Sequence, residues 1–171
     1  MTDPVQPGEP VTRMEPAAKA QLEKRLAVTG AVAAAIRAHG RETYPHECCG
    51  ALIGEAGCAT AILPLPNTTE EGPRRRFLVR SSDYRLAEQR AGELGGELLG
   101  FYHSHPDHPA RPSQYDLDHA WPFFSYVIVS VRDGCDEAMT AWWLRDDRSA
   151  FDEGEIEEGT RLQASGPGKN S

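Results

Sequence analysis

The chain has 171 residues, which is enough for one well-buried core and too few for two ordinary domains. Its composition is that of a globular protein, with 39% hydrophobic and 26% charged residues. The formal net charge of -8 argues against nucleic acid or an anionic membrane as the main partner.

No apolar run approaches the roughly 18 residues that a membrane-spanning helix needs. The N-terminus lacks the basic and apolar regions of a secretory signal. The cysteines show neither CxxC spacing nor a regular disulfide pattern: Cys48, Cys49, Cys58 and Cys135. We therefore expect a reduced, cytoplasmic protein.

The sequence predicts a disordered leader over residues 1–14, a single domain over residues 15–158 and a flexible tail over residues 159–171. Residues 15–39 are Ala-rich with one apolar face, which predicts one helix, or two helices separated at Thr29 and Gly30.

Short apolar runs then predict strands over residues 48–53, 59–65 and 76–79. A Ser-Ser-Asp cap predicts a helix over residues 81–93, which Gly95 and Gly96 end. A strand is expected over residues 97–105, a short helix over 113–121, a hairpin over 126–144 and an edge strand over 151–157. These elements predict an α/β fold, a mixed sheet flanked by helices.

The most informative residues follow the strand predicted over residues 97–105. His103 and His105 are two residues apart, and such residues project to the same side of an extended strand. Ser113 and Asp116 follow after a spacer of seven residues and add a hydroxyl and a carboxylate. Two imidazoles and a carboxylate are a common ligand set of catalytic zinc. Glu47 lies between a Pro-containing turn and an apolar strand, and it is the candidate general base.

Each of these parts has a simpler explanation. A bare His-x-His is more often a pair of surface or hydrogen-bonded histidines. Ser113 and Asp116 resemble a helix capping box, in which the serine hydroxyl engages a backbone amide instead of a ligand. Glu47 would have no special role if it were exposed, whereas a buried carboxylate needs a partner.

The complete set resembles the signature of the JAMM (MPN+) metallopeptidases. Glu47, then His103-Ser104-His105-Pro106, then Ser113 and Asp116 match that signature without a gap. The segments at residues 45–54, 100–105 and 125–131 are similar to those of the small stand-alone bacterial and archaeal members. The resemblance covers roughly residues 25 to 157.

This resemblance implies a three-layer α/β fold of the cytidine-deaminase-like type. It implies Zn²⁺ held by His103, His105 and Asp116, with Glu47 as general base, Ser113 at the oxyanion and Ser104 in a supporting role. The implied reaction is hydrolysis of a peptide or isopeptide bond, often after the Gly-Gly tail of a ubiquitin-like or β-grasp sulfur-carrier protein. Linkage-specific polyubiquitin cleavage is not expected, because core elements take up the 55 residues between Glu47 and His103.

Two other functions stay open at this point. Cys48 or Cys49 would be the nucleophile of a cysteine hydrolase, although vicinal cysteines that enter an apolar strand are more often buried core residues. A non-catalytic scaffold domain is the second alternative, although such relatives generally lack part of the metal set. We expect residues 127–144 to be exposed, and this hairpin is therefore the candidate interface of a homodimer.

Overall fold

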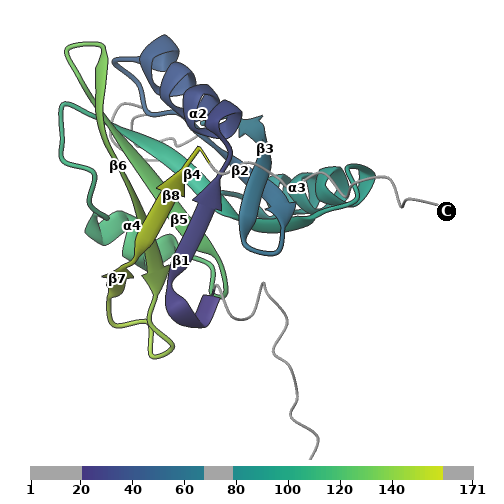
Figure 1. Ribbon diagram of the computed structural model, residues 1–171. Helices are drawn as coiled ribbons and strands as arrows, with labels where there is room; N and C mark the ends of the chain where they lie inside the picture. Colours follow the sequence, from purple (N-terminus) through teal and green to yellow (C-terminus); the bar gives the residue numbers. More distant parts are fainter. Residues whose placement is uncertain (1–20, 68–78, 160–171) are drawn as a thin grey trace, which may run out of the picture.

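The computed structural model describes residues 21–67 and 79–159 (Figure 1). Its centre is an eight-stranded mixed sheet in the order β7-β6-β5-β4-β2-β3-β1-β8. The strands are β1 (Arg25–Val28), β2 (Cys49–Glu55), β3 (Cys58–Leu65), β4 (Glu97–Pro106), β5 (Ser125–Arg132), β6 (Cys135–Leu144), β7 (Phe151–Glu153) and β8 (Glu155–Glu158). The helices are α2 (Gly30–Thr43), α3 (Ser81–Glu93) and α4 (Gln114–His119).

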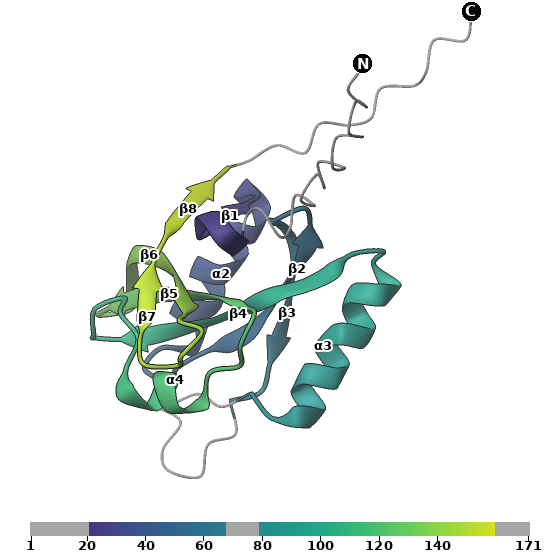
Figure 2. The same ribbon diagram turned by 90° about the horizontal axis from the view of Figure 1, so that it is seen from below.

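Helices α2 and α3 cover opposite faces of the sheet, as the views in Figures 1 and 2 show. On the α2 side, Ile36 packs in one buried cluster with Leu52 and Val127 of the strands. On the α3 side, Ala87 belongs to a second cluster with Phe101. Two apolar clusters separated by the sheet confirm the predicted α/β fold with helices on both faces.

Strand β4 lies in the interior of the sheet, antiparallel to β2 and parallel to β5. Its residues 100–106 are all buried. Since alternate side chains of a strand project to opposite faces, Tyr102 and Ser104 lie toward α2, while His103 and His105 lie on the face that α3 and α4 cover.

The helix predicted over residues 15–39 is present at residues 21–23 and again in α2, but the prediction is wrong over residues 25–28. Residues 25–28 form β1, which pairs with β3 and with β8. Leu26 and Val28 are buried while Arg25 is exposed, which is the two-residue alternation of a strand. Thr29 then caps α2, because its Oγ1 accepts a hydrogen bond from Val32 N at 3.2 Å. Pairing with strands distant in sequence overrides the helical propensity of this Ala-rich segment.

The single edge strand predicted over residues 151–157 is in fact two strands. β7 pairs with β6 and β8 pairs with β1, so consecutive strands form the two ends of the sheet. Gly154 joins them, and a methyl group at this position would lie 2.0 Å from Lys24 O and 2.3 Å from the Trp143 ring. Only glycine therefore fits at this junction.

The predicted hairpin is present as β5 and β6, but β5 is an interior strand and is almost wholly buried. The expectation that this hairpin is exposed is therefore wrong for β5, and the homodimer stays a prediction. Helix α4 is shorter than predicted and ends before Trp121 and Pro122, because a proline disfavours helical backbone in the residue before it.

Some predicted segments lie outside the described residues: the leader, residues 15–20 of the first predicted helix, the tail beyond Gly159 and all of the strand at residues 76–79 except Val79. Val79 is buried but is not part of a strand. Within the described part of the chain, we find no helix that is both long and apolar enough to cross a membrane.

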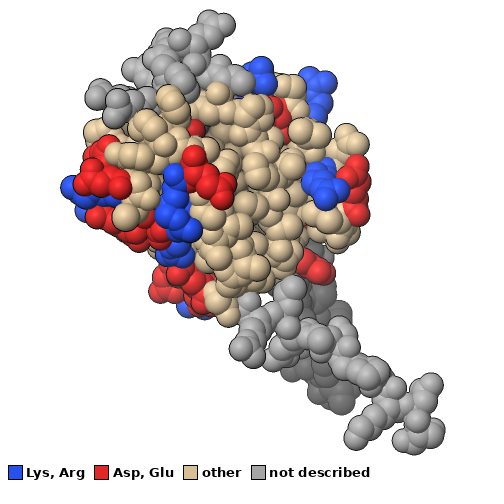
Figure 3. Space-filling view, turned by 90° about the horizontal axis from the view of Figure 1, so that it is seen from above, with Lys and Arg blue, Asp and Glu red and all other residues tan. Residues whose placement is uncertain are grey.

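Figure 3 shows acidic and basic side chains next to one another at the left and near the edges of this face, around a broad area that carries neither. Arg37, for example, pairs with Asp136 at 3.2 Å and with Glu158 at 2.6 Å. Neighbouring carboxylates thus offset such basic groups.

Candidate metal centre

Three side chains converge where β4 ends and α4 begins. The Nε2 atoms of His103 and His105 are 3.0 Å apart, and Asp116 Oδ2 lies 3.3 Å from His103 Nε2 and 3.5 Å from His105 Nε2. Tetrahedral zinc with bonds of about 2.0–2.1 Å requires ligand atoms about 3.3 Å apart. None of the three residues is more than 9% exposed. The donor atoms therefore fit a zinc ion.

Hydrogen bonding fixes the orientation of His105. Its Nδ1 lies 2.8 Å from Pro109 O, and because a carbonyl oxygen only accepts, Nδ1 carries the proton. The Nε2 lone pair of a neutral His105 then points toward the other two donor groups. Burial lowers the pKa of His103, although the charge of Asp116 opposes this effect. Neutral imidazole is the form that binds a metal.

Helix α4 begins with the capping box that the sequence suggested. Ser113 Oγ accepts from Asp116 N at 3.1 Å, and Asp116 Oδ2 accepts from Ser113 N at 2.7 Å. The cap and a catalytic serine are not mutually exclusive, because the oxygen of Ser113 accepts here while its hydroxyl hydrogen can still donate.

The carboxylate oxygen of Asp116 that caps α4 is the same atom that faces the two histidines. Burial would raise the pKa of Asp116, but His103, His105 and the Ser113 N–H outweigh it and hold this pKa far below its usual range. Asp116 is thus an anion in a buried site.

Glu47 lies just before β2 and close to Asp116, whose charge acts on it. Cys49 pairs with His103, and Ser104 N donates to Cys48 O at 3.1 Å, so the next step of this antiparallel register places Glu47 opposite His105. Glu47 is only 6% exposed, and its Oε2 has no hydrogen-bond partner among the described residues. Burial, followed by the charge of Asp116, raises the pKa of Glu47 to about 9. A polar atom in this position requires a partner, which a metal site with its water would supply.

Ser104 faces away from the donor atoms and holds β2 against β4. It is fully buried, and its Oγ accepts a hydrogen bond from Cys48 N at 2.8 Å. Together with the bond from Ser104 N to Cys48 O, this contact fixes the backbone next to Glu47.

Sequence reasoning missed Asn67, whose Nδ2 donates to Glu47 O at 3.1 Å. It also missed the carbonyl of Pro109 behind His105. The only signal for Asn67 was a polar residue just after a strand, and no spacing rule relates it to Glu47. A backbone carbonyl leaves no signal in the sequence.

The vicinal cysteines do not form a nucleophilic site. Cys48 and Cys49 are at most 2% exposed. Burial raises the pKa of both thiols, that of Cys49 to about 12. Because the thiolate is the nucleophile, this burial argues against the cysteine hydrolase.

Comparison with known proteins agrees with the donor set. Residues 29–145 match the family described as prokaryotic homologs of the JAB domain. The chain belongs to this family. A desampylase from Haloferax volcanii is 33% identical over 131 residues, which cover 72% of this chain and 91% of that protein. The resemblance to small prokaryotic JAMM proteins is thereby confirmed.

Solved structures share the fold of this JAB domain. A protein from Salinibacter ruber is 45% identical, with a TM-score of 0.62. The superposition covers 78% of this chain and 91% of that protein. A structure described as JAMM, a metalloprotease-like zinc site in the proteasome and signalosome, is 18% identical. The superposition covers 78% of this chain and 96% of that protein with a TM-score of 0.50. At 18% identity this similarity concerns the fold alone.

Proposed function

We propose that this JAB domain hydrolyses the peptide or isopeptide bond after the C-terminal Gly-Gly of a ubiquitin-like or sulfur-carrier protein. Family membership and the likeness to a desampylase support an isopeptidase-type hydrolase. One observation carries the proposal: three ligand atoms lie within 3.5 Å of one another, beside a buried carboxylate oxygen that has no hydrogen-bond partner among the described residues.

His103, His105 and Asp116 would hold Zn²⁺, which when bound polarises a scissile carbonyl and acidifies a water molecule. Three protein ligands are typical of catalytic zinc sites, whereas structural sites use four. The donor set would combine two neutral imidazoles with one carboxylate, and the hydrogen bond from His105 to Pro109 O would keep that ring in place.

Glu47 is the proposed general base. Its carboxylate would accept a proton from the attacking water and later deliver it to the departing amine. In the metal-free protein burial raises the pKa of Glu47, so its carboxyl group can hold a proton. The charge of a bound Zn²⁺ would lower this pKa and leave a carboxylate that can accept one. The contacts of Ser104 with Cys48 would keep Glu47 at the correct distance from the substrate.

Ser113 would donate its hydroxyl hydrogen to the carbonyl oxygen as negative charge develops there. One such donor typically contributes about 2.7–4 kcal/mol to transition-state stabilisation. The capping bond to Asp116 N would orient the Ser113 oxygen without using its hydrogen.

Zinc analysis combined with mass spectrometry tests the proposal. The substrate is a β-grasp carrier protein that is extended beyond its Gly-Gly terminus. The zinc-loaded wild type should release the extension after the second glycine, while Glu47→Gln should retain zinc and lose turnover. A fully active Glu47→Gln would reject the base assignment, and a folded wild type that binds no zinc would favour the non-catalytic scaffold.

A further inference from the structure

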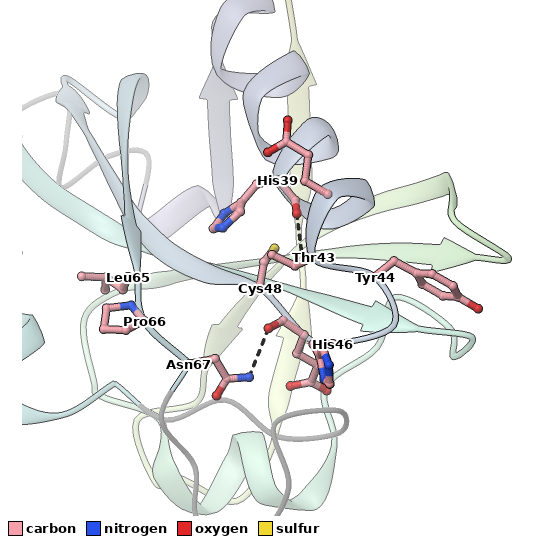
Figure 4. A pocket seen from close by; sticks show the side chains of 10 residues that line it. His39, Thr43, Tyr44, His46, Cys48, Leu65, Pro66 and Asn67 are labelled. Atoms are coloured by element: carbon pink, nitrogen blue, oxygen red, sulfur yellow. Dashed lines mark hydrogen bonds between the residues drawn. The ribbon is translucent and has the colours of Figure 1, made fainter.

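A cavity of about 610 Å³ opens beside Glu47, where the end of α2, the start of β2 and the end of β3 meet (Figure 4). Ordinary ligand pockets have volumes of about 300–1,000 Å³. Buried lining residues include Cys48 and Leu65, while Glu42 and His46 are exposed at the rim. In Figure 4, Leu65 and Pro66 lie on one side of this space and Tyr44 and His46 on the other.

Glu47 connects this cavity to the reaction. It lines the cavity, is only 6% exposed and has an Oε2 without a hydrogen-bond partner among the described residues. Under the proposed function, on which this inference rests, Glu47 returns a proton to the departing amine. That amine must therefore come within hydrogen-bond distance of Glu47, and the cavity offers space for the group that carries it.

The rim of the cavity carries a negative charge at exposed Glu42, and no lysine or arginine of the described residues lines the cavity. Glu47 adds no charge at neutral pH in the metal-free protein, because burial raises its pKa to about 9. Burial lowers the pKa of His39, and its Nδ1 is 2.8 Å from the hydroxyl of Tyr102, so His39 adds little positive charge at neutral pH. A cationic group would thus meet favourable charge at this rim.

A second cavity, of about 350 Å³, has the opposite character. It includes Ser113, the proposed oxyanion donor, and its apolar wall contains Trp142 and Phe151. Arg111 is the one charged residue that lines it within the described part of the chain. The charged residue at the rim is therefore acidic on the Glu47 side of the site and basic on the Ser113 side.

We infer that the cavity beside Glu47 receives the acceptor side of the scissile bond, and that Glu42 selects acceptors in which basic residues flank the modified lysine. The methylene chain of that lysine would pack against Leu65 and Pro66, and the flanking cations would lie near Glu42. The amide nitrogen itself is neutral before cleavage, so Glu42 interacts with the neighbouring cations and not with the reacting atom.

The test uses two substrates that differ only in charge. In both, the Gly-Gly terminus of a carrier protein is joined to the lysine of a short peptide, with arginine on both sides of that lysine in one and glutamate in the other. Zinc-loaded wild type should prefer the basic peptide in kcat/KM by about two- to fivefold, the effect of one exposed ion pair. Glu42→Lys should abolish or invert this preference.

Glu55→Lys is the matched control, because it makes the same charge change at an exposed position at the far end of β2. It should keep the preference of the wild type. Equal rates on both substrates, or an equal effect of Glu42→Lys and Glu55→Lys, would overturn the inference and leave the proposed function intact.

If the zinc-loaded wild type cleaves neither substrate, the proposed function is contradicted. A binding experiment then tests the selection of basic acceptors separately. The Glu47→Gln protein is titrated with the basic and the acidic peptide, each with a free lysine amine, while the imidazole NMR signals of His39 and His46 are followed. Shifts caused by the basic peptide alone support selection by this cavity. Absent shifts, or equal shifts with both peptides, refute it.

Discussion

Replacing Glu47 by glutamine should stabilise the metal-free protein at neutral and alkaline pH. In that state burial, together with the charge of Asp116, raises the pKa of Glu47 from 4.5 to about 9. Below pH 4.5 the carboxyl group is protonated in both the folded and the unfolded chain, so it does not weaken the fold. As the pH rises from 4.5 to about 9, the unfolded chain loses this proton first, and the free energy of unfolding decreases.

The size of the effect follows from the two pKa values. Each pH unit between them lowers the free energy of unfolding by about 1.4 kcal/mol. At pH 7 the wild type should therefore have lost about 3 kcal/mol relative to pH 4.5 through this one carboxyl group. Glutamine has a similar shape but does not ionise, so Glu47→Gln should not show this loss.

Denaturant titrations in the presence of a chelator measure the effect between pH 5 and pH 8. The difference in unfolding free energy between Glu47→Gln and the wild type should grow with pH, while exposed Glu97, changed to glutamine, should show no such trend. A constant cost of the glutamine side chain would shift every point equally and would not change the slope. If the difference between Glu47→Gln and the wild type does not depend on pH, burial does not raise the pKa of Glu47 and this reasoning is wrong.

Three further substitutions probe separate parts of the site. Asp116→Asn should lose zinc on dialysis, because the substitution removes the only carboxylate of the donor set. Metal analysis measures this loss, and full zinc occupancy would contradict the ligand assignment. Ser113→Ala should keep zinc, lower kcat by about 10²–10³-fold and cost about 1 kcal/mol of stability through the lost cap, whereas an unchanged kcat would leave the cap as its only role. Gly50→Ala should cost about 1–3 kcal/mol in thermal or chemical denaturation, because a methyl group there would lie 2.3 Å from the buried ring of Tyr102. An unchanged stability would mean that this ring can move aside.

Local signals were enough to predict the elements that carry most of the site. The apolar run before His103 predicts β4, and the alternation within that strand predicts that both histidines lie on one face. The Asp133-Gly134 pair predicts a tight turn between the strands of the hairpin, and in the structure both residues have the positive φ that such a turn needs. In each case the residues that determine the structure are close together in the sequence.

The errors concern contacts between distant parts of the chain. β1 has only four residues, and its longest pairing is with β8 near the other end of the chain. The split of the last predicted strand depends on the approach of Gly154 to Lys24 and Trp143. Likewise, Asn67 contacts Glu47 only because β2 and β3 are adjacent in the sheet. No periodicity in a local window reveals such contacts.

One short segment, residues 151–158, supplies the outermost strand at both ends of the sheet, β7 and β8. A strand with unpaired backbone groups can pair with another chain, and natural proteins avoid this by covering or shortening their outermost strands. Here β7 covers the Trp142–Leu144 end of β6 and β8 covers all four residues of β1, and Gly154 is the only residue between β7 and β8. Loss of residues 151–158 would uncover two long-range pairing surfaces at once. We therefore expect this segment, which contributes none of the metal ligands, to limit pairing of the sheet ends with other chains.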